Sequence, residues 1–212
     1  MSKGSLTGLF GATGFVGGNL LAQRDFDEQY SSQTVGASQG KHYSLLVSAG
    51  PGAVKWKANK FPEEDRAMID AYIGHLEKVS ADTLVGISTC DVYEVPRGVD
   101  EDTDIAKTLD TLHPYGKHRF ILEEFLRKHF PDHLIVRLPG LFGHGLKKNV
   151  IFDMMHDNQL DSVHSASTFQ FYNLNYLWGD IERARKAGIT LLNITTEPVS
   201  VAEVARAGFG KE

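Results

Sequence analysis

The sequence lacks several features that would assign the chain to a special class of protein. It has one cysteine, Cys90, in 212 residues, so no intrachain disulfide can form and we expect a reducing compartment. No apolar run reaches membrane-spanning length, and the N-terminus does not have the pattern of a signal peptide. The net charge of −5 and the pI near 6.0 do not favour nucleic acid or an anionic membrane as a partner. These absences predict a cytoplasmic protein that binds neither nucleic acid nor membrane.

Patterns typical of metal sites and repeat proteins are missing as well. The histidines at positions 113, 118, 144, 156 and 164 have no ligand-like spacing with one another or with carboxylates, so we expect no metal site. There is no internal repeat, low-complexity tract or Pro/Ser-rich linker. What remains is an ordinary globular composition, with 42% apolar and 23% charged residues.

Short apolar runs alternate with amphipathic segments along the whole chain, which predicts βα units around a parallel sheet. Strands are expected at residues 6–10, 33–37, 44–47, 83–88, 134–138 and 190–194. Helices are expected at residues 15–23, 63–78, 116–129, 150–156, 178–187 and 201–207. The predicted fold class is α/β, a doubly wound parallel sheet of the Rossmann-like kind in a single domain over residues 1–212.

One spacing indicates a shortened first half. Only the six residues "SQGKHY" separate the second expected strand from the third. A parallel crossover needs about a dozen residues or more. We therefore expect that one strand and its helix are missing, and that the chain runs directly to the other side of the first strand.

A glycine-rich loop follows the first expected strand and opens a helix. In "LFGATGFVGG", the first glycine allows a tight turn, the second a close approach to a pyrophosphate, and the third close helix packing. A glycine-rich turn without a ligand is the alternative. The strand–turn–helix context favours nucleotide binding. The residues predicted to bind the cofactor here are Gly11, Thr13, Gly14, Phe15, Val16 and Gly17.

The choice of nucleotide depends on the residues after the second strand. An NAD site usually has an Asp or Glu about 20 residues after the loop, yet no acidic residue occurs between Tyr30 and Pro62. Ser38 and Lys41 follow the expected strand instead and would accept a 2′-phosphate. The prediction is therefore NADP, with NAD as the open alternative. A loop that is simply polar, without a ligand, would explain the same residues.

Four motifs in one order resemble the extended short-chain dehydrogenase/reductase family of NAD(P)-dependent epimerases and dehydratases. They are the glycine loop, "STCDVY", "YGKHR" and "RLPGLFG", and the likeness continues through "FQFYNLNYLWGDIERA" and "LLNITTEPVSVAEVA". The resemblance implies catalysis on a hydroxyl or carbonyl of a sugar-nucleotide substrate. Family members usually continue further, so the chain is expected to be a compact or truncated variant. A small substrate lobe is expected from about residues 140–180 and 195–212.

The resemblance implies a catalytic group made of a Ser/Thr, a Tyr and a Lys four residues after the Tyr. Thr89 has the position of the hydroxyl, with Ser88 as second candidate, and Tyr115 has the position of the tyrosine. Arg119 stands where the family has lysine. Because a free phenol has a pKa of about 10, it needs a nearby cation to ionise near neutrality. Arg119 keeps that charge and would also hold the cofactor ribose, so we expect a working pair, against the alternative of an exposed surface arginine.

Further residues follow from the same resemblance. Ala49 and Gly50 would approach the cofactor riboses. Lys147, Lys148 and Asn149 would bind the substrate, although a solvated lysine pair explains them equally well. The helix at 116–129 corresponds to a dimer helix of the family, so a homodimer is a hypothesis.

Two classes of function therefore remain open. One is an NAD(P)-dependent oxidoreductase, epimerase or dehydratase acting on a small molecule such as a sugar nucleotide. The other is a catalytically attenuated NADP-binding protein with a regulatory or assembly role, which the Arg119 substitution favours. A structural scaffold without nucleotide is a third reading, and it requires the glycine loop to be accidental.

Overall fold

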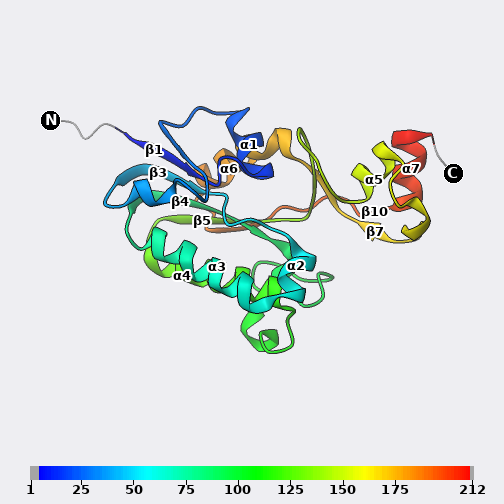
Figure 1. The fold of residues 1–212 in the computed structure, drawn as a ribbon, viewed down its shortest axis with the longest axis horizontal. Coiled ribbons are helices and arrows are strands. Elements are labelled where there is room, and N and C mark those ends of the chain that lie inside the picture. The colour runs from blue at the N-terminus through cyan, green and yellow to red at the C-terminus, as the bar shows by residue number, and fades with distance from the viewer. Residues whose placement is uncertain (1–4, 211–212) are drawn as a thin grey trace.

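The computed structural model of the chain describes residues 5–210 and contains one six-stranded sheet (Figure 1). All neighbouring strands pair in parallel, in the order β2-β1-β3-β4-β5-β9. The strands are β1 (Thr7–Phe10), β2 (Glu28–Tyr30), β3 (His42–Ser48), β4 (Ser80–Thr89), β5 (His133–Leu138) and β9 (Leu191–Asn193). The sheet confirms the predicted doubly wound α/β fold.

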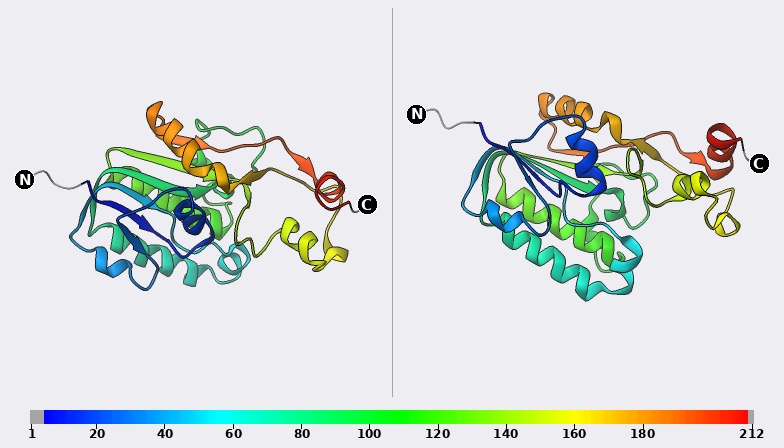
Figure 2. Two further views of the ribbon diagram at one scale, coloured as in Figure 1. Left: turned by 90° about the horizontal axis from the view of Figure 1, so that it is seen from above. Right: turned by 45° about the horizontal axis from the view of Figure 1, so that its top comes forward.

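Helices cover both faces of the sheet (Figure 2). Helices α3 (Pro62–Leu76) and α4 (Pro114–His129) lie on one face, and α1 (Phe15–Leu21) and α6 (Leu177–Lys186) lie on the other. Alternate strand residues serve the two faces, because side chains alternate along a strand. Leu9 packs with the α1 and α6 side, whereas Phe10 packs with the α3 and α4 side.

The second strand is not where the sequence pattern placed it. The prediction of a strand at residues 33–37 is wrong, because β2 ends at Tyr30 and a tight turn begins at once. The Thr34 and Val35 amides both donate to the Ser31 carbonyl, and residues Val35–Ser38 form a 3-10 turn. The apolar side chain of Val35 reaches the core from this turn rather than from a strand.

The shortened first half is confirmed. From β2 the chain passes through residues 31–41 and enters β3 on the other side of β1, without an intervening strand or long helix. One βα unit of a doubly wound half is therefore absent between β2 and β3.

A small lobe projects from the carboxyl side of the sheet (Figure 1). It has its own apolar cluster, in which Met154 packs with Val201 and Ala205. The lobe elements are α5 (Val150–His156), β7 (Thr168–Phe169), β10 (Val199–Ser200) and α7 (Val201–Phe209). Strands β6 (Gly140–Phe142) and β8 (Phe171–Asn173) pair in parallel and lead into and out of it.

The remaining helical elements are short. Helix α2 (Lys55–Lys60) precedes α3, and five 3-10 turns complete the described chain. These turns are η1 (Val35–Ser38), η2 (Cys90–Val92), η3 (Ile105–Thr108), η4 (Leu160–Ser162) and η5 (Leu174–Tyr176). Within residues 5–210, no helix is both long and apolar enough to cross a membrane.

Candidate active site

The glycine loop occupies the turn between β1 and α1 at the carboxyl end of the sheet. Gly11 has a φ of +82°, and its amide donates to the Tyr30 carbonyl at 2.8 Å. A Cβ on Gly17 would lie 2.1 Å from the Gly11 oxygen, so only glycine permits this helix packing. Gly14 is the N-cap residue of α1, and no side chain caps the helix. The first amides of α1 therefore remain without a side-chain partner.

The other predicted loop residues surround this turn. Thr13 is exposed, and Phe15 and Val16 are half-buried against the apolar cluster beneath α1. Ala49 and Gly50 follow β3 and lie directly against the turn, since a Cβ on Gly11 would be 2.7 Å from the Ala49 carbonyl. The structure thus brings together the two segments that the sequence predicted to meet at the cofactor.

Ser38 and Lys41 do not belong to this group, and their prediction as 2′-phosphate ligands is wrong. They precede β3 and lie at the amino end of the sheet, whereas the glycine loop follows the carboxyl end of β1. The Ser38 hydroxyl is buried and donates to the Val35 carbonyl, and the Lys41 ammonium pairs with Glu28 at 2.5 Å. The misplaced second strand caused the error.

The residues that follow β2 are Ser31, Ser32 and Gln33, and they lie at the carboxyl end with the loop. Ser31 is about 20 residues after Gly11, which is the spacing at which dinucleotide folds contact the ribose. That spacing was a usable signal in the sequence. None of these residues is acidic, so the absence of an NAD-type carboxylate persists after the correction.

Thr89 ends β4 and Tyr115 lies in the first turn of α4, and the two side chains are neighbours. The Thr89 side chain is close enough to the phenol of Tyr115 to lower its pKa. The Thr89 Oγ1 also accepts the Asp91 amide at 3.1 Å, which fixes its orientation. The Tyr115 amide donates to the Asn59 side chain at 3.0 Å. The predicted hydroxyl and phenol are therefore brought together at the carboxyl end of the sheet.

Arg119 lies below Tyr115 on α4, as the spacing predicted, but its charge is already paired. The guanidinium makes two hydrogen bonds of 3.1 Å to the two carboxylate oxygens of Asp65, on α3. It also donates to the Gly52 carbonyl at 3.0 Å. The side chains of Arg119 and Asp65 are only 6% and 5% exposed. Both terminal nitrogens of Arg119 are thus bound to protein.

The electrostatic consequence contradicts the expected phenolate. The pKa of Tyr115 is raised, chiefly because burial disfavours the charged form. Arg119 lowers this pKa, but Asp91 and Asp65 raise it. The Arg119 carbon Cζ lies 4.6 Å from the centre of the Tyr115 ring, which is a cation–π contact with the ring face. The direction of the pKa shift in this structure is therefore opposite to the one expected for a Tyr115–Arg119 pair, and the phenol is neutral at neutral pH.

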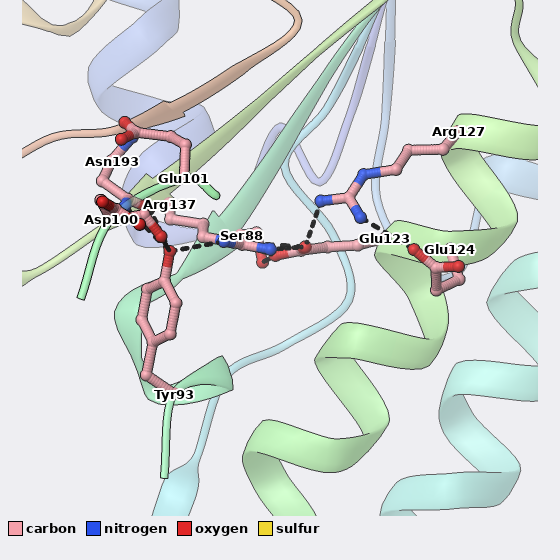
Figure 3. Close-up of polar contacts among 9 residues, drawn as sticks. All are labelled: Ser88, Tyr93, Asp100, Glu101, Glu123, Glu124, Arg127, Arg137 and Asn193. Carbon is pink, nitrogen blue, oxygen red and sulfur yellow. Dashed lines mark hydrogen bonds and ion pairs between the residues drawn. The ribbon is translucent and has the colours of Figure 1, made fainter. Parts of the chain in front are cut away.

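Ser88 was the second candidate for the catalytic hydroxyl, but its side chain binds Glu123 instead (Figure 3). The Ser88 hydroxyl donates to Glu123 at 2.5 Å, and Glu123 is 1% exposed. Arg137 binds both carboxylate oxygens of Glu123 and donates to the Tyr93 hydroxyl at 2.7 Å. Ser88 is therefore part of a buried polar network, and Thr89 remains the hydroxyl beside Tyr115.

Two of the three predicted substrate residues make hydrogen bonds within the protein. Asn149 has a φ of +96°, and its side chain accepts the Ile151 and Phe152 amides at the start of α5. The same side chain donates to the Leu141 carbonyl, so the amide has a structural role. The Lys148 ammonium donates to the Ala53 carbonyl at 2.5 Å, and burial lowers its pKa. Lys147 is exposed.

Segment 51–60 contains contacts that sequence reasoning missed. Its members bind the site from one side: Gly52 accepts from Arg119, Asn59 accepts from Tyr115, and Lys55 pairs with Asp91 at 2.5 Å. These partners come from distant parts of the chain, so neither spacing nor periodicity could reveal them. Asn59 and Asp65 carry no local motif.

A cavity of about 470 Å³ lies beside the loop that follows β6. Its lining includes His144, Ile151 and Asn173. The volume is within the range of small-molecule sites. Thr89, Tyr115 and Arg119 do not line this cavity. Among residues 5–210, no three His, Cys, Asp or Glu side chains are grouped as metal ligands.

The chain matches no protein-family model and no curated protein sequence. Solved structures do resemble it. One is TunA, an NAD-dependent NDP-hexosamine 5,6-dehydratase involved in tunicamycin biosynthesis (TM-score 0.73, 16% identity, 95% of this chain and 79% of that one). Another is dTDP-4-dehydrorhamnose reductase from Bacillus anthracis in complex with NADP (TM-score 0.73, 18% identity, 97% and 80%). A third is MoeE5 in complex with UDP-glucose and NAD (TM-score 0.63, 18% identity, 97% and 82%).

These likenesses show the class of fold. The chain has the Rossmann-like fold shared by these sugar-nucleotide dehydratases and reductases, as its motifs predicted. It covers about four fifths of their length.

Proposed function

We propose that the protein is an NAD(P)-dependent oxidoreductase, epimerase or dehydratase that acts on a hydroxyl or carbonyl of a sugar-nucleotide substrate. The observation that carries the proposal is the grouping of the glycine loop, Thr89 and Tyr115 at the carboxyl end of one parallel sheet. Ligands of doubly wound folds bind at that end. NAD(P) would lie on the loop, against Gly11, Gly14 and Ala49, and would supply or accept hydride.

The protein side chains would position the substrate. The Thr89 hydroxyl would hydrogen-bond the reacting oxygen, and the neutral Tyr115 phenol would donate its proton to that oxygen or receive it. NADP is favoured over NAD, because no carboxylate follows β2 and the exposed Ser32 would contact a 2′-phosphate there. The Ser31 hydroxyl already accepts the Gln33 amide.

A fluorescence titration with NADPH and, separately, NADH tests the cofactor part. We expect saturable binding with a preference for NADPH. A preference for NADH would overturn only the choice of cofactor. Absence of binding by both nucleotides would overturn the proposed function itself.

The second candidate is a catalytically attenuated NADP-binding protein with a regulatory or assembly role. The pairing of Arg119 with Asp65 favours it, because the cation that should assist Tyr115 is neutralised inside the protein. Turnover of a panel of sugar nucleotides by wild type and Tyr115→Phe separates the two functions. Turnover that the substitution reduces by about 100-fold supports the enzyme, whereas NADPH binding without turnover supports the attenuated protein.

A further inference from the structure

His113 is a titratable side chain beside the site that the proposed mechanism has not used. It is the N-cap residue of α4, and its Nδ1 accepts the Gly116 amide at 3.1 Å. The imidazole is half-buried and stacks on the Tyr115 ring at 6.3 Å between centroids, with 20° between the planes. The cap and the stacking together hold the ring in one orientation next to the phenol.

The cap determines which ring nitrogen carries the proton. A nitrogen that accepts a hydrogen bond is unprotonated, so the neutral ring of His113 has its proton on Nε2. No described residue forms a hydrogen bond with Nε2, whereas Nδ1 is fully used. His113 therefore presents an oriented N–H donor that has no partner among residues 5–210.

Burial and a neighbouring cation keep the imidazole neutral. Burial is the main cause that lowers the pKa of His113, and Lys55 of α2 lowers it further, while Asp91 of η2 raises it. Protonation would also remove the cap and place a positive charge at the positive end of the helix dipole. The neutral form with the proton on Nε2 is thus the form present at neutral pH.

We propose that His113 is a substrate-contacting residue, whose Nε2–H donates a hydrogen bond to the hydroxyl or carbonyl oxygen of the sugar nucleotide near Thr89 and Tyr115. The inference rests on the proposed function. A second neutral donor polarises a carbonyl without being consumed, which suits a site where Tyr115 is not ionised. No covalent step is involved, and the proton stays on Nε2.

Two substitutions separate this contact from the helix cap. Serine is a good N-cap residue but has no group at the position of Nε2, so His113→Ser keeps the cap and removes the donor. His113→Ala removes both. We expect His113→Ser to melt within about 1 °C of wild type and His113→Ala about 2–4 °C lower. A substantial fall in the melting temperature of His113→Ser would overturn the assignment of the cap.

The tautomer is measured directly by long-range ¹H–¹⁵N correlation spectra at pH 7.5, with the His113 signals assigned by their loss in His113→Ser. We expect the Nε2-protonated pattern. The Nδ1-protonated pattern would overturn the proposal, because the ring would then have no free donor at Nε2.

The substrate contact is tested by calorimetric titration with UDP-glucose in saturating NADPH. We expect His113→Ser to bind NADPH like wild type and UDP-glucose about three- to tenfold more weakly, the effect of one neutral hydrogen bond. Equal UDP-glucose affinity in the two proteins would overturn this inference alone. A wild type that binds NADPH but not UDP-glucose would also overturn it, whereas a wild type that binds no NADPH would mean that the proposed function has failed.

Discussion

Arg119 shows that the type of a residue does not fix its electrostatic effect. The side chain has the charge and the helix position that would assist a phenol, but Asp65 binds it with two hydrogen bonds of 3.1 Å. The Nδ1 of His118 donates to the same carboxylate at 2.8 Å. Asp65 therefore decides how much of the Arg119 charge acts on Tyr115. A lysine at position 119 could not form this two-pronged contact.

We expect Asp65→Asn to lower the pKa of Tyr115, because a negative charge that opposes phenolate formation is removed. The measurement is phenolate absorbance against pH. The Tyr115 signal is the difference between Asp65→Asn and the same variant carrying Tyr115→Phe. The buried Arg119 loses its counter-charge, so the free energy of unfolding should fall by about 3–5 kcal/mol.

The control for this change is Asp70→Asn, also on α3, whose side chain is 51% exposed and pairs with Arg66. We expect it to leave the Tyr115 titration unchanged and to cost less than about 1 kcal/mol of stability. An unaltered Tyr115 pKa in Asp65→Asn would contradict the role given to Asp65.

At the scale of elements, the glycine loop depends on the close approach of α1 to the turn after β1. Gly17→Ala would place a Cβ 2.1 Å from the Gly11 oxygen, whereas a Cβ on Gly18 meets nothing within 4 Å. We expect Gly17→Ala to abolish NADPH binding or weaken it by at least about 100-fold, because the turn must move. Gly18→Ala should bind like wild type in the same fluorescence titration. Equal affinities of the two variants would show that the loop does not hold the cofactor.

The cap of α4 predicts a pH dependence of stability. The pKa of His113 is lower in the folded protein than its usual 6.5, so the unfolded chain binds the proton more readily. Stability is therefore fully present above about pH 6.5 and is lost as the pH falls from there to the folded pKa. We expect the wild type to lose stability relative to His113→Ser over this range in urea titrations at a series of pH values. Parallel pH profiles of stability in the two proteins would contradict the pH dependence assigned to His113.

At the scale of the whole molecule, the buried network around Glu123 joins four parts of the fold (Figure 3). Ser88 comes from β4, Glu123 from α4 and Arg137 from β5, and Tyr93 receives a hydrogen bond from Asn193 of β9. The side chains of Glu123 and Arg137 are each 2% exposed, with 2.6 Å between the nearest charged atoms. The network thus ties the sheet to α4, which carries Tyr115.

We expect Arg137→Leu to destabilise the protein by about 3–5 kcal/mol, because Glu123 is left as a buried charge with only Arg127 beside it. Glu123→Leu combined with Arg137→Leu should be less destabilised than Arg137→Leu alone, since no unpaired charge remains. Urea unfolding measures both. The control Arg183→Leu removes an ion pair from a side chain that is 77% exposed and should cost less than about 1 kcal/mol. Similar losses for Arg137→Leu and Arg183→Leu would contradict the role of the network.

The local patterns of the sequence predicted much of the fold correctly. Five of the six expected strands overlap the strands observed in the sheet, and all six expected helices are present. Thr89 and Tyr115 are neighbours, and the glycine loop follows β1 at the same carboxyl end of the sheet, whereas their roles in catalysis and cofactor binding stay predictions. The short β2 was missed, because residues 28–30 are too few for a period to be read, while the apolar Val35 imitated a strand.

The sequence by itself determined five strands of the sheet, six helices and the turn between β1 and α1, because these depend on neighbours along the chain and on the conformational freedom of glycine. Only the tertiary structure decided which charges meet. Asp65 lies 54 residues before Arg119, and Glu123 lies 35 residues after Ser88. These partners bind because α3, α4 and β4 pack side by side, and the low polarity of the buried site forces each charge to find a counter-charge. The neutral state of Tyr115 is a product of that packing.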